Sequence, residues 1–285
     1  MRRTWHDDKD PCAREISVRG GPATSFTLVD PRHDLPHLQE RWSREQSFHD
    51  ALAEQFDPNA MPASDPIHYD EAVLAAARIV GGTRVLDLGC GQGDMTLTLL
   101  ARGAVVTALD LSPGILGIAQ RRTELYANGR NATFVVAPAE RTGLSSADFD
   151  VIVGRWILHH VDVQAAAAEL ARLLVPGGRA VFLENSGANP ILNFARDHIA
   201  GRFGVPRVGT RDERPLVRQD WRVLEQNFAS VRAEYPIVDV FELMNRQVFR
   251  YRSRRVETIC RGLDRLIGRS RLRKYSYRVL VIAEK

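Results

Sequence analysis

The sequence has few of the features that mark several common classes of protein. Its 285 residues include three cysteines, Cys12, Cys90 and Cys260, and their odd number and wide spacing argue against a disulfide framework or a metal cluster. No apolar run approaches the roughly 18–20 residues that a membrane-spanning helix needs. Two arginines follow Met1 without an apolar stretch behind them, so we expect no signal peptide and a cytoplasmic protein.

Lysine is also scarce, because Lys9, Lys274 and Lys285 are the only three in the chain and arginine supplies the remaining basic side chains. The formal net charge is +4. Residues 246–278, however, hold eleven arginines and one lysine against two acidic residues, which is a net charge of +10 and leaves −6 for the rest. This basic segment therefore needs an explanation of its own.

Short apolar segments alternate with helical patterns through most of the chain. We expect residues 1–35 to be a leader that is either flexible or attached to the surface of the domain, and residues 36–82 to form a helical lid. Alternating strands and helices in residues 83–285 are typical of an α/β protein, with a parallel sheet covered on both faces. The last two expected strands lack a full crossover helix, which predicts an antiparallel pair at the sheet edge. The expected strands span residues 84–88, 104–110, 134–136, 149–153, 179–183, 231–238 and 275–283.

A glycine-rich turn follows the first expected strand. In the segment Val85–Gly93 the glycines at 89, 91 and 93 would let a ligand approach the main chain closely. A dinucleotide site has the spacing G-x-G-x-x-G/A, and the sequence does not fit it whether the motif starts at Gly89 or at Gly91. Asp87 and Asp94 would also repel a pyrophosphate. These carboxylates suit a cationic ligand without phosphate, such as S-adenosylmethionine. Asp110 ends the next strand and could accept hydrogen bonds from its ribose hydroxyls.

From about residue 67 to residue 185 the chain resembles the class I S-adenosylmethionine-dependent methyltransferases. Val85–Gly93 is similar to the first motif of this family, and Asp110 to its ribose-binding acid. Residues 137–140 are similar to the segment that meets the adenine, with Pro138 in place of the usual aspartate. Further similarity lies in the fourth-strand segments, residues 149–153 and 157–161, and in the turn at residues 174–179.

The resemblance implies a Rossmann-like, seven-stranded sheet of order 3-2-1-4-5-7-6 with an antiparallel seventh strand. It also implies S-adenosylmethionine as cofactor, S-adenosylhomocysteine as product and no metal. The expected cofactor-binding residues are Asp87, Gly89, Gly91, Gly93, Asp110, Leu111, Ala139, Glu140 and Arg155. Arg155, just past the fourth strand, could instead reach the substrate or have a structural role.

Three titratable side chains are expected at the mouth of the site. His159 and His160 follow the fourth strand, and Glu184 ends the fifth. Some sugar O-methyltransferases that the chain resembles pair a histidine in this loop with such an acid. We therefore expect one histidine, preferably His160, to be a general base that Glu184 orients. The alternative is that all three have structural roles. His49 and Asp50 on the helical lid are weaker candidates.

These features predict methyl transfer to a small molecule, on an oxygen of a natural product, sugar or lipid-like acceptor. Residues 185–226 and 239–274 would cover that acceptor. N- or C-methylation, methylation of a nucleic acid and a non-catalytic binding module remain open. No Asn/Asp-Pro-Pro-Tyr/Phe motif follows the fourth strand, which counts against methylation of nucleic-acid bases.

The basic segment also has an apolar stripe at helical spacing. One interpretation is an amphipathic helix that packs on the domain and has a solvated basic face. The other is a surface for an anionic membrane or an anionic substrate. The stripe consists of Val256, Ile259, Cys260, Leu263, Leu266 and Ile267.

Overall fold

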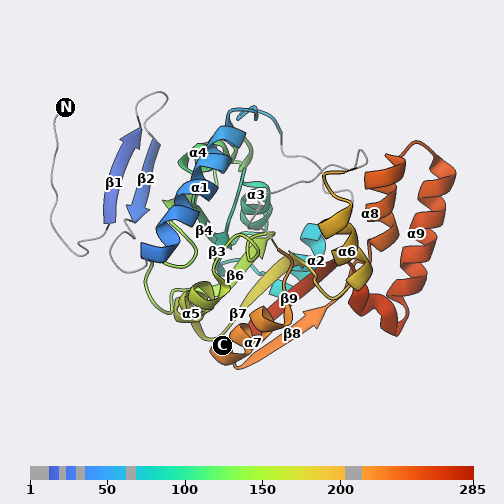
Figure 1. Ribbon diagram of the computed structural model, residues 1–285. Helices are drawn as coiled ribbons and strands as arrows, with labels where there is room; N and C mark the ends of the chain where they lie inside the picture. The colour runs from blue at the N-terminus through green and yellow to red at the C-terminus, as the bar shows by residue number, and fades with distance from the viewer. Residues whose placement is uncertain (1–12, 19–23, 30–35, 62–68, 203–213) are drawn as a thin grey trace.

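The computed structural model in Figure 1 describes residues 13–18, 24–29, 36–61, 69–202 and 214–285. A single mixed sheet runs through its centre. The strands are β1 (Ala13–Val18), β2 (Thr24–Val29), β3 (Arg84–Leu88), β4 (Val105–Asp110), β5 (Ala132–Val136), β6 (Phe149–Arg155), β7 (Leu174–Asn185), β8 (Ser230–Glu234) and β9 (Arg278–Glu284).

Helices pack on both faces of this sheet (Figure 1). In the described part of the chain, none is both long and apolar enough to cross a lipid bilayer. The helices are α1 (Pro36–Ala53), α2 (Tyr69–Ala77), α3 (Asp94–Ala101), α4 (Pro113–Tyr126), α5 (Val163–Leu173), α6 (Pro190–His198), α7 (Arg218–Asn227), α8 (Val240–Met244) and α9 (Arg254–Gly268).

The expected seven-stranded sheet is confirmed. The strand order β5-β4-β3-β6-β7-β9-β8 is the order 3-2-1-4-5-7-6, and β9 runs antiparallel to both of its neighbours. The central strand β3 pairs in parallel with β4 and with β6. The strand order reverses between β3 and β6, and open sheets of this kind bind ligands beyond the carboxyl ends of the strands at such a point.

The described part of the leader is attached to the central sheet. β1 and β2 form an antiparallel pair, and β2 adds in parallel to β5, so the sheet has nine strands. Residues 24–29 (TSFTLV) are rich in β-branched and aromatic residues, which favour strands. The glycine pair at residues 20–21 is typical of a hairpin link as well as of a break. The rest of the expected leader lies outside the described residues.

The core lies on the two faces of the central strands. Side chains alternate along a strand, so Val85 packs with residues of α2 and α3 while Leu86 packs with residues of α5 and α7. On β7 the same alternation places Val181 on the face of Val85 and Phe182 on the face of Leu86. These four side chains are fully buried. This packing fixes the carboxyl ends of the strands, where the candidate site lies.

Candidate active site

The turn between β3 and α3 keeps its main chain open to a ligand. Gly89, Gly91 and Gly93 all have left-handed φ angles, of 65°, 54° and 86°. A Cβ on Gly91 would meet nothing within 4 Å, whereas one on Gly93 would lie 3.0 Å from the Cα of Ala119. Gly91 therefore borders open space, while Gly93 lets α3 pack closely on α4.

A cavity of about 300 Å³ lies between this turn, α1 and the carboxyl ends of β3 to β6. Most of the expected site residues contribute to its wall, whereas Asp87, Gly93, His159 and Glu184 do not. The expected residues that line it are Gly89, Gly91, Asp110, Leu111, Ala139, Glu140, Arg155 and His160.

Asp110 presents a firmly held carboxylate at the end of β4. Its Oδ2 accepts a hydrogen bond from the Gly91 N–H at 3.0 Å, and its Oδ1 accepts one from the Ser112 N–H at 2.9 Å. Burial raises the pKa of this carboxyl, and the N–H groups oppose that effect. A carboxylate has about four acceptor positions, so acceptor positions remain for vicinal hydroxyls such as those of a ribose.

Asp87, near the end of β3, is a buried acid beside the glycine turn. It is 2% exposed, and its Oδ2 accepts a hydrogen bond from the Thr96 hydroxyl at 2.6 Å. Burial raises its pKa to about 6, although the Thr96 bond and the charge of Arg155 oppose the shift. A cation bound nearby would favour the ionised form of this carboxyl.

Two further residues of the expected cofactor site also hold the protein together. Glu140 accepts hydrogen bonds from the Trp42 indole N–H at 3.1 Å and from the Asp162 N–H at 2.9 Å, so it joins α1 to the start of α5. Arg155 forms an ion pair with Asp70 of α2. Both side chains line the cavity, and their contact with a cofactor stays a prediction.

Glu184 pairs with His159, and that it orients the imidazole of His160 stays a prediction. The His159 Nδ1 lies 2.8 Å from the Glu184 Oε2, and both side chains are buried. The other oxygen of Glu184 accepts hydrogen bonds from the N–H groups of Ile157 and Leu158 at 2.8 and 2.7 Å. Together these bonds fix the loop after β6, and with it the position of His160.

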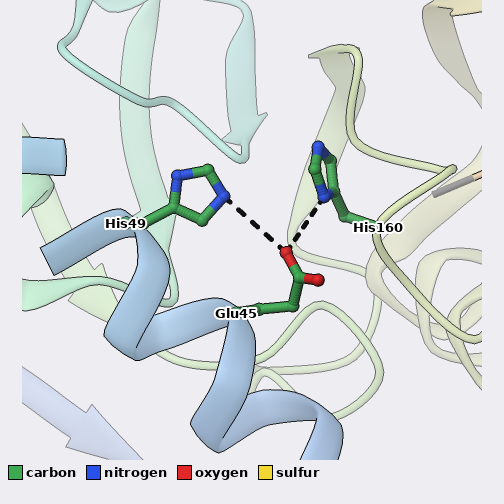
Figure 2. Close-up of side chains that lie close together, drawn as sticks. All are labelled: Glu45, His49 and His160. Atoms are coloured by element: carbon green, nitrogen blue, oxygen red, sulfur yellow. Dashed lines mark hydrogen bonds and ion pairs between the residues drawn. The ribbon is translucent and has the colours of Figure 1, made fainter. Parts of the chain in front are cut away.

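His160 faces a carboxylate that α1 supplies. The His160 Nδ1 lies 3.1 Å from the Glu45 Oε2, and the His49 Nε2 lies 3.8 Å from the same oxygen (Figure 2). Glu45 is only 5% exposed, and all three side chains line the cavity. Their ligating atoms lie within 4.8 Å of one another. Such a group suits a proton acceptor with its counter-charge, and it is also a donor set that a divalent metal ion could use.

Sequence reasoning missed Glu45, although the pattern contains a signal. Trp42, Glu45, His49, Leu52 and Phe56 follow one another at intervals of three or four residues and all line the cavity. This spacing places them on one face of a helix. An acidic residue and a histidine within an otherwise apolar helical stripe could therefore have been recognised as candidates.

Asp50, one of the weaker candidates, attaches α1 to the protein. Its Oδ1 accepts hydrogen bonds from the Ser112 hydroxyl and, at 3.1 Å, from the Gly114 N–H at the start of α4. With the Trp42–Glu140 and Glu45–His160 contacts, it holds α1 over the cavity at three points. The segment expected to be a helical lid contains α1 and α2, and its function as a lid stays a prediction; residues 62–68 of that segment lie outside the described part.

The sheet, the glycine turn and the acid at the end of β4 define a nucleoside-binding enzyme of Rossmann-like fold. A family model described as "Methyltransferase domain" matches residues 86–182. Over 230 residues the chain is 31% identical to the ubiquinone/menaquinone biosynthesis C-methyltransferase UbiE of Rhizobium etli, covering 75% of this chain and 87% of that protein. The chain belongs to the class I S-adenosylmethionine-dependent methyltransferases, and it methylates a small molecule with S-adenosylmethionine as cofactor.

A second relative resembles a shorter part of the chain. The ubiquinone biosynthesis O-methyltransferase of Aromatoleum aromaticum is 38% identical over 105 residues, which is 36% of this chain and 44% of that protein.

Two solved structures have the same fold at low identity. The cyclase SpnF has a TM-score of 0.57 and 14% identity, covering 85% of this chain and 96% of that one. Phosphoethanolamine N-methyltransferase 2 of Haemonchus contortus, in complex with phosphomonomethylethanolamine and S-adenosylhomocysteine, has a TM-score of 0.54 and 15% identity. It covers 92% of this chain and 62% of that one.

The residues present fit S-adenosylmethionine. Gly91 leaves open space beside the main chain, and Asp110 retains acceptor positions for a ribose. Asp87 supplies negative charge near a ligand whose sulfonium and ammonium groups are positive. These residues are the ones we expect to hold the cofactor.

The raised pKa of Asp87 predicts that cofactor binding depends on pH. Affinity for S-adenosylmethionine should fall as the pH drops below about 6, because protonation removes the negative charge that favours a cation. Calorimetric titrations between neutral and mildly acidic pH would measure this change. Adenosine has neither positive group and should bind with little pH dependence. A variant with Asp87→Asn should bind S-adenosylmethionine weakly at every pH, and an unchanged affinity in that variant would contradict the prediction.

Proposed function

We propose that this enzyme methylates a hydroxyl oxygen of a lipid-like small molecule in the cytoplasm. The main support for this proposal is the His160–Glu45 pair in the wall of the cavity. Methyl transfer to a hydroxyl oxygen needs a group that accepts the hydroxyl proton, and His160 is placed to do so. The names of two relatives, both of quinone biosynthesis, support a lipid-like acceptor. The free thiols of Cys90 and Cys260 are consistent with a reducing compartment.

The chemistry divides between the cofactor and the chain. Bound S-adenosylmethionine supplies a methyl carbon that its sulfonium activates. It would transfer this methyl group to the acceptor oxygen and leave as S-adenosylhomocysteine, and His160 would accept the proton that the hydroxyl loses. Because Nδ1 of His160 faces Glu45, the tautomer with a proton on Nδ1 leaves Nε2 to accept it. The carboxylate of Glu45 then stabilises the imidazolium.

Methylation of carbon is a second candidate. The relative with the longer alignment, UbiE, is named as a C-methyltransferase, whereas the named O-methyltransferase aligns over 105 residues only. The candidates differ in which acceptor atom carries the methyl group in the product.

Product analysis tests the proposal. We would incubate the protein with methyl-labelled S-adenosylmethionine and hydroxylated aromatic acceptors, with and without an isoprenoid tail, and locate the label by mass spectrometry and NMR. We expect an O-methyl product, formed faster from tailed acceptors. Matched acceptors whose hydroxyl is already methylated should give no product. Transfer to a ring carbon would overturn the oxygen assignment, and preference for acceptors without a tail would overturn the lipid-like assignment.

A further inference from the structure

Helix α9 is attached to the domain through a polar side chain. Its buried side chains are Cys260 and Asp264. The Asp264 carboxylate accepts hydrogen bonds from the N–H groups of Phe241 and Glu242 at 2.9 and 2.8 Å, at the start of α8. The carboxylate therefore stabilises the N-terminus of α8, and this contact orients α9.

Half of the apolar stripe of α9 points outward. Ile259 is 60% exposed, Leu263 38% and Leu266 68%, whereas Cys260 is buried, so the stripe packs on the domain only in part. Ile259 and Leu266 lie seven apart, two turns along one side of the helix. The exposed Arg255 lies one turn before Ile259, and the exposed Arg269 lies one turn after Leu266. This side of the helix therefore has an exposed arginine at each end.

Other exposed apolar side chains gather at this end of the molecule. Of the seventeen large hydrophobic side chains that are exposed in the described residues, ten belong to α6 and residues 244–275. The Asn189 side chain, at the start of α6, donates a hydrogen bond to the Tyr275 carbonyl at 2.8 Å and joins the two parts. We call this surface the α6–α9 face; among its exposed side chains are Ile191, Phe194, Phe249, Ile259, Leu266 and Leu272. Most of the large exposed apolar side chains are therefore concentrated on one part of the structure.

The same face is strongly basic. Residues 246–278 carry a net charge of +10, and their two acidic residues are both engaged. Asp264 is buried against α8, and Glu257 pairs with Arg261 at 2.7 Å. A second copy of this chain would bring like charges together, which opposes self-association through this face. A nucleic acid would use the charge but not the exposed apolar side chains.

The surface of an anionic bilayer uses both properties. Apolar side chains enter the boundary between headgroups and acyl chains while arginines remain among the anionic headgroups. We propose that the α6–α9 face docks this enzyme on an anionic lipid bilayer. This goes beyond the proposed function, because docking needs neither cofactor nor acceptor.

Docking here would also bring the active site to the membrane. α6 follows the carboxyl end of β7, and the cofactor cavity lies at the carboxyl ends of β3 to β6, so both lie at the same edge of the sheet (Figure 1). That a docked enzyme takes its acceptor from the bilayer is the part of the inference that rests on the proposed function.

Vesicle flotation tests the docking. The full chain should float with phosphatidylcholine vesicles that contain phosphatidylglycerol, bind pure phosphatidylcholine weakly, and lose binding as salt rises. The double variant Ile259→Ser, Leu266→Ser should weaken binding at least about ten-fold. Replacing Arg255 and Arg269 with glutamine should weaken it about thirty-fold, at roughly five-fold per arginine. The matched control is Val105→Ser, which removes a side chain that is 61% exposed on β4.

Each alternative gives a different result. Absence of flotation with anionic vesicles at low salt would overturn the proposal. Loss of binding in the arginine variant but not in the apolar variant, with competition by an oligonucleotide, would assign the face to a polyanion. A dimer in solution that the apolar variant abolishes would assign it to a second copy. Turnover of a short, water-soluble acceptor is measured with the unaltered chain in the absence of vesicles, so failure of docking is distinguishable from failure of methyl transfer.

Discussion

A variant with His160→Gln should turn over about 10²–10⁴-fold more slowly than the original protein, which is the usual contribution of a general acid or base. Glutamine can keep a hydrogen bond to Glu45 but cannot take a proton from the acceptor. Affinity for S-adenosylmethionine should hardly change, because the expected cofactor-binding residues lie in other segments of the cavity wall. Single-turnover kinetics together with calorimetry would separate these two quantities.

Glu45 provides a companion test. Glu45→Gln removes the counter-charge of the imidazolium and should cause a smaller loss of turnover than His160→Gln. Glu40→Gln, on the same helix with a side chain that is 92% exposed, is the matched control and should have no effect. Near-normal turnover in a folded His160→Gln protein would contradict the role of His160 as base. If a chelator abolishes activity and Zn²⁺ or Mn²⁺ restores it, Glu45, His49 and His160 hold a metal ion instead.

Asp110→Ala should weaken S-adenosylmethionine binding by about 1–3 kcal/mol, the scale of hydrogen bonds to a charged group. This corresponds to roughly 5- to 150-fold in the dissociation constant. The variant removes the expected ribose acceptor and the acceptor for the Gly91 N–H, so the glycine turn also loses support. Calorimetric titration measures the affinity.

The control for Asp110 is an acid that lies away from the cavity. Asp148→Ala removes a half-exposed carboxylate that pairs with Arg84 at 3.2 Å, and it should leave cofactor affinity unchanged. Thermal unfolding of both variants checks that they are folded. Normal binding in a folded Asp110→Ala protein would exclude Asp110 from the cofactor site.

The central sheet was predictable because its signals are local. Each parallel strand is a short apolar run, and Ser112-Pro113 marks the start of α4, where the Ser112 hydroxyl accepts a hydrogen bond from the Ile115 N–H. The β1–β2 hairpin was not predicted, because whether a strand pairs at a sheet edge depends on the neighbouring strand, here β5.

The site was predictable where its residues follow one another along the chain. Gly89, Gly91 and Asp110 belong to two adjacent strand ends, and their place in the wall of the cavity follows from the strand order. Which of two neighbouring histidines meets Glu184 depends on side-chain directions within a loop, and sequence spacing does not specify these. The partner of His160 comes from a helix more than a hundred residues earlier, so tertiary packing alone reveals it.

The attachment of α1 has a kinetic consequence. The helix forms one wall of the cofactor cavity and also provides the carboxylate that faces His160. Any displacement of α1 that opens the cavity would also separate Glu45 from His160 and admit water. Access and reactivity are therefore coupled: the imidazole has its carboxylate partner only while the cavity is covered. If product leaves and cofactor enters by displacement of α1, exchange breaks the contact between Glu45 and His160, and the release of α1 becomes a step that limits turnover.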